Sequence, residues 1–202
     1  MRFTERDARL LHWINGHGFV TVEQAAHWMG TTYQTGAHRI RLLVDGGYLR
    51  RERILHGDPR IHRVTEQGLL ACEDTLVQLQ SVNLGTYKHD LMLVDLAHSV
   101  VEATSGAFVP ERRLRHQLGM NGARGHVPDG LLQIDGQKPI AVELELSIKA
   151  KDRVEAIVED YAADRTLAAV WYFVTSQAVR RFLEKITTGY GLFEIHDWEV
   201  AR

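Results

Sequence analysis

Three acidic side chains, those of Asp129, Glu143 and Glu145, have the chemistry and spacing needed to hold a divalent cation. Oxygen ligands are what Mg²⁺ prefers in proteins, and a metal held by carboxylates can activate water for attack on a phosphodiester. Without a counter-charge such a cluster is unfavourable, because like charges repel and carboxylates are costly to desolvate. The sequence therefore predicts a cofactor, Mg²⁺ or Mn²⁺, bound by these three acids. Lys149 could stabilise the phosphate charge or orient the water, and Arg124 could approach a phosphate.

The strands predicted around these acids explain why they should meet. Residues 139–148 are expected to form a strand on which the two glutamates share one face, because side chains alternate along a strand. The apolar residues between them favour a central strand, and an edge strand kept soluble by charge is the alternative. A tight turn at residues 135–136 would pair this strand with residues 127–134, which carry Asp129.

The second part of the chain, residues 88–202, is expected to be an α/β (α+β) domain. Apolar periodicity predicts, in order, a helix, three strands, a helix, a strand, a helix and a strand. The expected bounds of these elements are 89–104, 108–116, 127–134, 139–148, 151–164, 168–175, 176–186 and 192–195. The first six elements give the order αβββαβ, a sheet with helices on its faces.

Residues 1–80 are expected to form a separate domain, followed by a linker at residues 81–87. Its predicted helices are 4–15, 21–30, 33–45 and 65–79, and its predicted hairpin strands are 48–54 and 60–64. The second helix begins with a capping box formed by Thr21 and Gln24. Three helices followed by a basic hairpin are what a winged helix-turn-helix requires.

Basic and polar side chains are concentrated where such a domain would contact DNA. Its third helix enters the major groove, and its hairpin, the wing, lies along the backbone or the minor groove. Arginine suits phosphates and guanine edges, whereas glutamine can read adenine. The predicted DNA-binding residues are Gln34, His38, Arg39, Arg41, Arg50, Arg51, Arg53, Arg60 and Arg63. Double-stranded DNA is therefore the expected partner, and a merely solvated helix face is the alternative.

Bulk composition sets the remaining limits. The net charge of −2 hides an asymmetry, because residues 1–65 hold ten arginines against six acids and the rest of the chain is acidic. The single cysteine excludes an intramolecular disulfide and a cysteine-rich zinc site. No apolar stretch is as long as a membrane span requires. We therefore expect a cytoplasmic protein with no membrane partner.

The acidic motif carries a resemblance to a nuclease superfamily. In its αβββαβ order, the chain resembles the PD-(D/E)XK nucleases through Pro128, Asp129, Glu143, Leu144 and Glu145. The resemblance implies that Asp129 and Glu143 bind the metal and that Glu102 matches an acid that some members carry on the preceding helix. At position 145 the usual lysine is a glutamate, as in some restriction endonucleases, and inactivated relatives also lose this lysine. Lys149 or Lys151 would have to replace it.

Nearly the whole chain also resembles the replication-relaxation family of plasmid and mobile-element proteins. The matching segments are Tyr48-Leu49, Thr65-Glu66-Gln67-Gly68, Lys88-His89-Asp90, Pro128-Asp129-Gly130 and Val142-Glu143-Leu144-Glu145. This resemblance implies a winged helix joined to a PD-(D/E)XK nuclease-like domain.

Two functions follow from these expectations. The first is a Mg²⁺-dependent endodeoxyribonuclease that acts in the replication, mobilisation or transfer of a plasmid or mobile element. The alternative is a non-catalytic transcriptional or replication regulator, whose second domain serves homodimerisation or partner binding. The glutamate at position 145 favours the regulator, and the pair Asp129 and Glu143 favours the enzyme. A protein-interaction module without nucleic acid is a third possibility.

Overall fold

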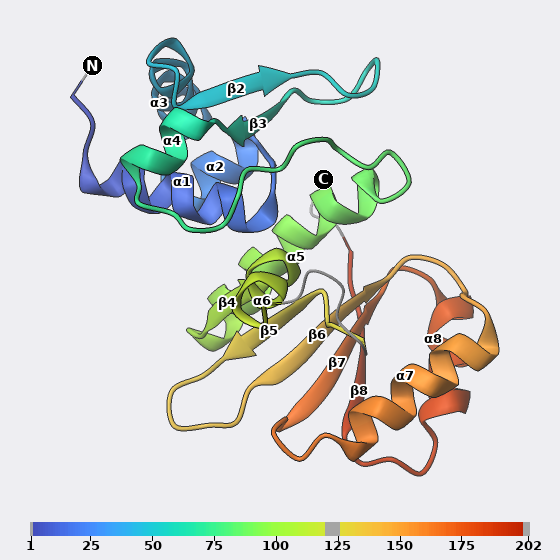
Figure 1. Ribbon diagram of the computed structural model, residues 1–202. Coiled ribbons are helices and arrows are strands. Elements are labelled where there is room, and N and C mark those ends of the chain that lie inside the picture. The colour runs from blue at the N-terminus through green and yellow to red at the C-terminus, as the bar shows by residue number, and fades with distance from the viewer. Residues whose placement is uncertain (1, 120–125, 200–202) are drawn as a thin grey trace. The chain divides into compact units, whose positions relative to one another are not determined.

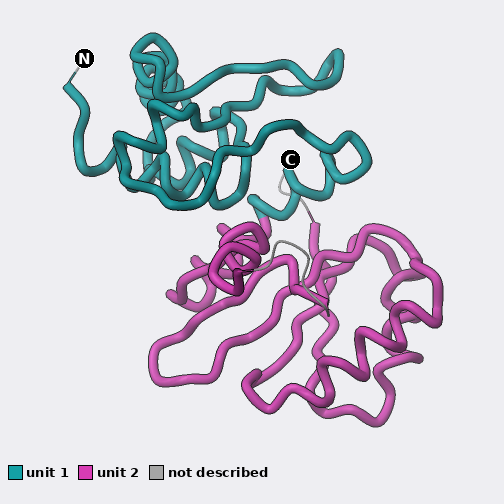
Figure 2. The backbone as a smooth tube through the Cα atoms, in the orientation of Figure 1, with its two compact units in different colours: residues 1–95 teal, residues 96–202 magenta. Residues whose placement is uncertain are grey.

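The computed structural model describes residues 2–119 and 126–199, so Arg124 lies outside the described residues. The fold is mixed α/β, of the α+β kind that the sequence predicted, and the chain divides into two compact units, Met1–Asp95 and Leu96–Arg202 (Figures 1 and 2). The division falls inside the helix α5 (Tyr87–Thr104), whereas the sequence analysis placed a linker at residues 81–87. Among the described residues, no helix has the length and apolarity needed to cross a bilayer.

Unit 1 combines helices with a small antiparallel sheet. Before α5, its elements are α1 (Glu5–His17), β1 (Val20–Thr21), α2 (Val22–Trp28), α3 (Tyr33–Asp45), β2 (Leu49–Glu52), β3 (Ile61–Val64) and α4 (Glu66–Ala71). The strand order is β1-β3-β2, with both pairs antiparallel. The two-residue strand β1 was not predicted, because so short a segment shows no alternation of polar and apolar residues.

Local sequence signals fix the starts of the first helices. The capping box predicted at Thr21 is confirmed, because its hydroxyl accepts from the backbone of Gln24 and the Gln24 side chain accepts from the backbone of Thr21. Thr4 and Asp7 form a second capping box at the start of α1. The buried core then joins α1, α2, α3, β2 and β3 through Leu10, Leu11, Ile14, Ala25, Ile40, Leu43, Leu49 and Val64.

The helix predicted at residues 65–79 is wrong beyond Ala71. Glu73 has a φ of 53°, in the left-handed region, and the backbone N–H of Asp74 bonds to the carbonyl of Leu69. This is a helix-terminating arrangement, because the left-handed conformation cannot continue the helix. The carbonyl of Leu76, three residues further on from Glu73, accepts from the buried Asn15 side chain at 2.7 Å.

The last part of unit 1 is the start of α5. The Tyr87 ring is fully buried and stacks on Phe19 at a centroid distance of 5.7 Å. The Gln24 side chain donates to the carbonyl of Leu91 at 2.9 Å and to the carboxylate of Asp95 at 3.0 Å. The first turns of α5 therefore belong to the core and to the hydrogen-bond network of unit 1.

Buried His62 on β3 gives unit 1 a predicted dependence of stability on pH. Burial, followed by the charges of Arg51 and Arg60, lowers the pKa of His62 from 6.5 to about 4. As the pH falls, His62 is protonated in the unfolded chain before it is protonated in the folded one. The stability that neutral His62 contributes is therefore complete above pH 6.5 and decreases as the pH falls towards 4. The expected loss is about 3 kcal/mol of unfolding free energy. Urea denaturation between pH 4 and 7 measures it.

A matched pair of variants isolates this effect. His62→Gln should remove the part of the pH dependence of the unfolding free energy that His62 contributes, because the titrating group is gone. His56 lies exposed in the turn of the same hairpin, so His56→Gln should leave the dependence unchanged. Equal slopes for wild type and His62→Gln would contradict the assignment.

Unit 2 is built on one five-stranded mixed sheet. After α5, its elements are β4 (Ala107–Pro110), α6 (Glu111–Gln117), β5 (Gly130–Gln133), β6 (Ile140–Glu145), α7 (Lys151–Ala163), β7 (Ala169–Val174), α8 (Gln177–Thr187) and β8 (Phe193–Asp197). The strand order is β4-β5-β6-β7-β8. The pairs β4-β5 and β5-β6 are antiparallel, whereas β6-β7 and β7-β8 are parallel.

The strand predicted at residues 108–116 is wrong in its second half. β4 ends at Pro110, and α6 follows immediately, so the order contains a helix that the αβββαβ pattern lacks. Proline is well tolerated at a helix start, and the ion pair of Glu111 with Arg115 at 2.6 Å has the i,i+4 spacing that supports a helix. The apolar residue Leu114 is buried from this helix, although its neighbours are charged.

β6 is the middle strand of the sheet, as the sequence favoured. All six of its residues are buried, including Glu143 and Glu145. The parallel register places Glu143 beside Tyr172 and Glu145 beside Val174, so these side chains share the face on which α7 and α8 pack. The edge-strand alternative is therefore wrong, because both glutamates are enclosed by neighbouring strands and helices.

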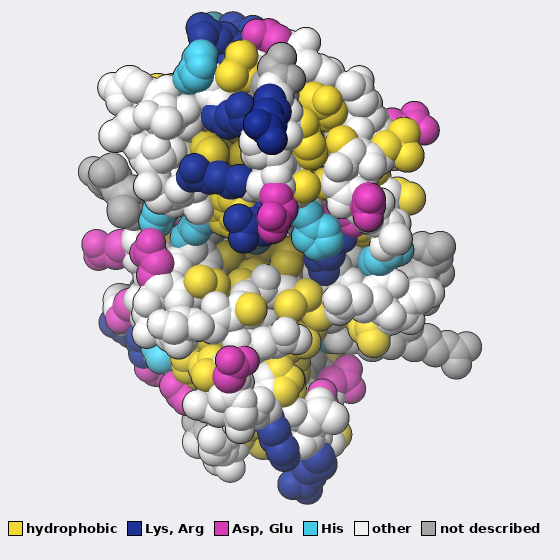
Figure 3. Space-filling view, turned by 90° about the vertical axis from the view of Figure 1, so that its left-hand side faces the viewer, with side chains coloured by type: hydrophobic (Ala, Val, Ile, Leu, Met, Phe, Trp, Pro, Cys, Tyr) yellow, Lys and Arg dark blue, Asp and Glu magenta, His cyan; other side chains and the backbone are white. Residues whose placement is uncertain are grey.

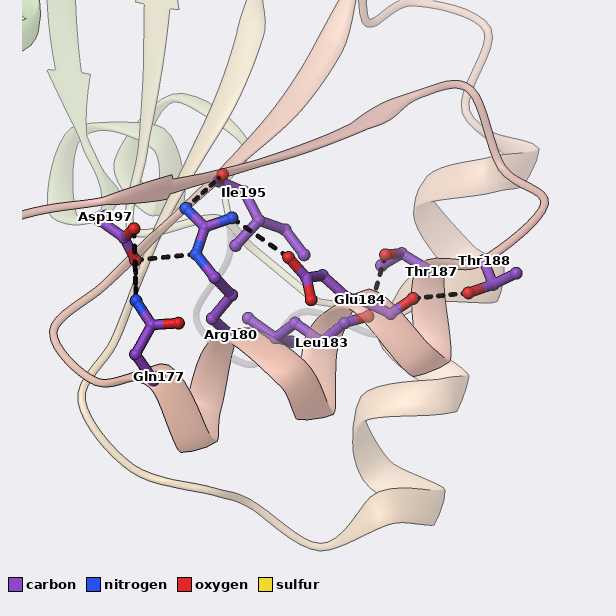
Figure 4. Close-up of polar contacts among 8 residues, drawn as sticks. All are labelled: Gln177, Arg180, Leu183, Glu184, Thr187, Thr188, Ile195 and Asp197. Atoms are coloured by element: carbon purple, nitrogen blue, oxygen red, sulfur yellow. Dashed lines mark hydrogen bonds and ion pairs between the residues drawn. The ribbon is translucent and has the colours of Figure 1, made fainter.

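The sheet ends at β8, which is fastened to α8 through one arginine (Figure 4). The Arg180 guanidinium donates to Asp197 at 2.8 Å and to the carbonyl of Ile195 at 2.9 Å, and it pairs with Glu184 at 3.2 Å. The hydrogen bond to Asp197 is the main cause that raises the pKa of Arg180. Arg180 therefore connects the helix to the backbone of an edge strand.

Candidate functional site: a carboxylate pair in unit 2

The β5-β6 hairpin brings Asp129 to Glu143. Gly130 pairs with Val142, so continuing the antiparallel register by one residue places Asp129 opposite Glu143. The Asp129 carboxylate accepts from the backbone N–H of Leu144 at 2.8 Å, which holds it against β6. The predicted turn is confirmed, because Gly136 has a φ of 74° and Gln137 donates to the carbonyl of Ile134.

Gly130 allows this arrangement at the start of β5. A Cβ atom at this position would overlap the ring of Phe108 on the neighbouring strand β4. Only glycine allows the aromatic ring to lie across β5 directly beside Asp129. The glycine of the segment Pro128-Asp129-Gly130 therefore has a packing role, and the aspartate has the polar one.

Glu143 is buried with two polar partners. Its side chain is 3% exposed, and its Oε1 atom is hydrogen-bonded to Nε2 of His126 and accepts from the hydroxyl of Tyr161. Tyr161 lies on α7, and its ring meets the His126 ring edge to face at 5.4 Å. Three segments far apart in the sequence therefore converge on one carboxylate.

Burial, followed by the charge of Asp129, raises the pKa of Glu143 to about 7, although the bonds from His126 and Tyr161 act in the opposite direction. Burial lowers the pKa of His126, but the hydrogen bond and charge of Glu143 outweigh it, so the net shift is upward. The pair therefore stabilises charge on both partners, but for Glu143 this effect is smaller than the combined effect of burial and Asp129. Burial also raises the pKa of Tyr161, which stays protonated and acts as a donor.

Glu145 and Lys149 form the second part of the predicted site. Lys149 donates to Oε1 of Glu145 at 2.5 Å, and the glutamate side chain is 9% exposed against 37% for the lysine. The prediction that residues 139–148 form one strand is wrong at its end, because β6 stops at Glu145. Lys149 thus reaches the carboxylate from the segment that precedes α7.

Lys151 and Glu102 were the other two candidates for the site. Lys151, at the start of α7, pairs with Glu155 of the same helix at 2.9 Å. Glu102 is exposed near the end of α5. Of the two possible replacements for the missing lysine, Lys149 is therefore the one that the fold brings to a predicted acid.

The donor chemistry of the site fits a hard divalent cation. Asp129 and Glu143 supply carboxylate oxygens from adjacent strands, and Glu145 follows on the same face of β6. Burial and the charge of Asp129 raise the pKa of Glu143, and a bound cation would favour the charged form of this carboxylate. In residues 2–119 and 126–199, no three His, Cys, Asp or Glu side chains are already arranged as a metal-binding group.

The predicted DNA-binding residues of unit 1 fall into two groups. Those that are exposed are Gln34, His38 and Arg41 on α3, and Arg51, Arg53 and Arg60 on and beside the strands of the hairpin. His38 and Arg41 are 2.9 Å apart, from Nδ1 to the guanidinium. On one face of the molecule, Lys and Arg side chains gather with histidines beside them (Figure 3).

The second group, Arg39, Arg50 and Arg63, is held by internal contacts. Arg39 binds the buried Asp7 of α1 through two guanidinium nitrogens. Arg63 is buried, donates to both carboxylate oxygens of Glu52 at 2.6 and 2.7 Å, and also reaches the carbonyl of Leu79. Arg50 pairs with Glu52 at 2.8 Å and reaches the same carbonyl at 3.3 Å. These three arginines join elements of unit 1 together.

The sequence analysis did not include His126 and Tyr161 in the site. His126 lies three residues before Asp129, and this nearness was the only sequence signal for it. Tyr161 continues the helical spacing of the apolar residues Val154 and Val158, so the sequence predicts a core residue at this position. Only its hydroxyl group distinguishes it from the apolar residues of the same helix face. Its role depends on how α7 packs over β6, which no local pattern reveals.

No protein-family model matches the chain, and no solved structure gives a significant match. Support for a function must therefore come from the residues and geometry of the chain itself.

Proposed function

We propose that the chain is a double-stranded-DNA-binding protein whose second unit hydrolyses phosphodiester bonds with Mg²⁺ or Mn²⁺. The observation that carries the hydrolytic part is the pairing of the half-buried Asp129, which immediately precedes β5, with the buried Glu143 of β6. The resemblance to the replication-relaxation family adds the expected setting, which is the replication, mobilisation or transfer of a plasmid or mobile element.

The topology of unit 1 supports DNA binding. The order α1-β1-α2-α3-β2-β3, with a sheet β1-β3-β2, is the arrangement that a winged helix-turn-helix needs. Gln34, His38 and Arg41 are exposed on α3, which would be the helix in the major groove. Arg51 and Arg53 are exposed on the hairpin, which would be the wing, where their charge suits phosphate contacts.

The residues of unit 2 can be given roles in hydrolysis. Asp129, Glu143 and Glu145 would hold the cation, which when bound activates water and neutralises charge on the phosphate. His126 and Tyr161 hold the Glu143 carboxylate in place. Lys149, which is at Glu145 and partly exposed, would stabilise the negative charge that develops on the phosphate.

A regulator without catalysis is the second candidate, and one observation favours it. Position 145 carries a glutamate, whereas the PD-(D/E)XK nucleases that the chain resembles usually carry lysine there. The amino group of Lys149 is already paired with this glutamate at 2.5 Å. In this case unit 2 would serve homodimerisation or partner binding, and the buried acids would have only a structural role.

DNA binding is tested by removing two exposed arginines. Arg41→Ala combined with Arg53→Ala should weaken binding to duplex DNA, because each cation that neutralises a phosphate releases counterions. The slope of log K (the association constant) against log salt concentration is negative, and its magnitude should decrease by about 2, at roughly 0.9 per lost phosphate contact. Fluorescence anisotropy over a salt series measures both quantities.

The matched control removes two exposed arginines of unit 2, Arg153→Ala with Arg181→Ala, which changes the net charge equally. This variant should keep the wild-type slope. An unchanged slope in the double variant of unit 1 would contradict DNA binding by α3 and the hairpin.

Catalysis is tested on supercoiled plasmid with the full chain. Incubation with Mg²⁺ or Mn²⁺ should give nicked or linear plasmid, and EDTA should prevent it. Binding without any cleavage in either metal would contradict the nuclease and favour the regulator. A dimer in solution, measured by light scattering, would add to the case for the regulator.

A further inference from the structure

The two hydrogen bonds on Glu143 are distributed unevenly between its oxygens. Tyr161 and His126 both bind Oε1. Among the residues that the structure describes, Oε2 has no hydrogen-bond partner. Within the described residues, one oxygen of this buried carboxylate therefore carries both hydrogen bonds and the other carries none.

The packing around Tyr161 restrains the ring whose hydroxyl donates to Oε1 of Glu143. The residue is only 6% exposed and packs in the core cluster with Val158 and Tyr172. Its ring also meets His126 edge to face and contacts Phe193, at centroid distances of 5.4 and 6.4 Å. This packing restricts the direction from which the Tyr161 hydroxyl can donate to Glu143.

We propose that Tyr161 is a positioning residue, which together with His126 holds Oε1 of Glu143 and thereby reserves Oε2 for a divalent cation. This inference rests on the proposed function, because it assumes that Glu143 binds the metal. Groups that orient a metal ligand through a hydrogen bond typically change metal affinity by about 10- to 100-fold.

The test measures metal binding without DNA and without turnover. Free Mn²⁺ is followed by electron paramagnetic resonance as it is titrated with wild type, Tyr161→Phe and Tyr172→Phe. Tyr172 is the matched control, because it lies beside Glu143 on β7 and is equally buried in the same cluster, but makes no hydrogen bond to Glu143 within the described chain. Thermal melts show that each variant is folded.

Tyr161→Phe should weaken Mn²⁺ binding by about 10- to 100-fold, whereas Tyr172→Phe should change it less than about twofold. His126→Gln, which keeps a donor, should bind more tightly than His126→Ala. Tight Mn²⁺ binding that is unchanged in Tyr161→Phe would overturn the positioning role and leave the proposed nuclease intact. Failure of the wild type itself to bind Mn²⁺ would overturn both.

Discussion

Replacing Asp129 or Glu143 by alanine is expected to reduce plasmid cleavage by roughly 1,000-fold, because a bound metal supplies several kcal/mol of transition-state stabilisation and about 1.4 kcal/mol is tenfold. Each variant removes one of the two acids that adjacent strands bring together. The rate of nicking of supercoiled plasmid in Mg²⁺ measures the effect.

Two further variants separate chemistry from folding. Glu143→Gln keeps the shape of the side chain and should be as inactive as alanine, because it lacks the negative charge. Glu159 is an exposed acid on α7, so Glu159→Ala should cleave at the wild-type rate. Cleavage that persists in both the Asp129 and the Glu143 variant would reveal a contaminating nuclease and contradict the assignment.

Asp7→Asn is expected to lower the free energy of unfolding by about 2 to 4 kcal/mol, because it leaves the Arg39 guanidinium without its counter-charge. The aspartate side chain is 3% exposed and the arginine 25%, so the pair is less costly to break than a fully buried one. Asp7 also accepts from the backbone and the hydroxyl of Thr4 at 2.7 and 2.6 Å, which the asparagine oxygen can still do. Urea denaturation at neutral pH measures the difference.

The pH dependence gives the same pair a second signature. Burial raises the pKa of Asp7, but the bonds from Arg39 and Thr4 outweigh it and hold the pKa below 3.8. The stability from the pair is therefore present above 3.8 and is lost as the pH falls through the lowered value. Wild type and Asp7→Asn should converge in acid. Asp45→Asn, on the exposed face of α3, should stay within about 0.5 kcal/mol of wild type at every pH.

Local signals predicted most of the elements because they depend on neighbouring residues. The capping box at Thr21, the turn at Gly136 and the alternation along β6 each involve residues that are close in sequence. The errors arise where one residue interrupts a pattern. Pro110 divides an expected strand from the helix α6, and the left-handed Glu73 ends α4 early.

The acids of the candidate site could be predicted from the sequence, whereas the side chains that hydrogen-bond to them could not. Asp129 and Glu143 belong to one hairpin, so strand periodicity and a turn suffice to bring them together. Tyr161 reaches Glu143 only through the packing of α7 on the sheet, which depends on contacts distant in sequence. For the same reason, the sequence could not distinguish Arg39, bound to Asp7, from the exposed Arg41 two residues later.

The continuity of α5 determines how the molecule can be dissected. A fragment cut at residue 80 would lose the Tyr87 ring that stacks on Phe19, and it would strip Gln24 of both its acceptors on the helix. Apolar surface and a buried amide would then be exposed to water, which favours aggregation. A DNA-binding fragment intended for isolated study should therefore retain the chain through Asp95.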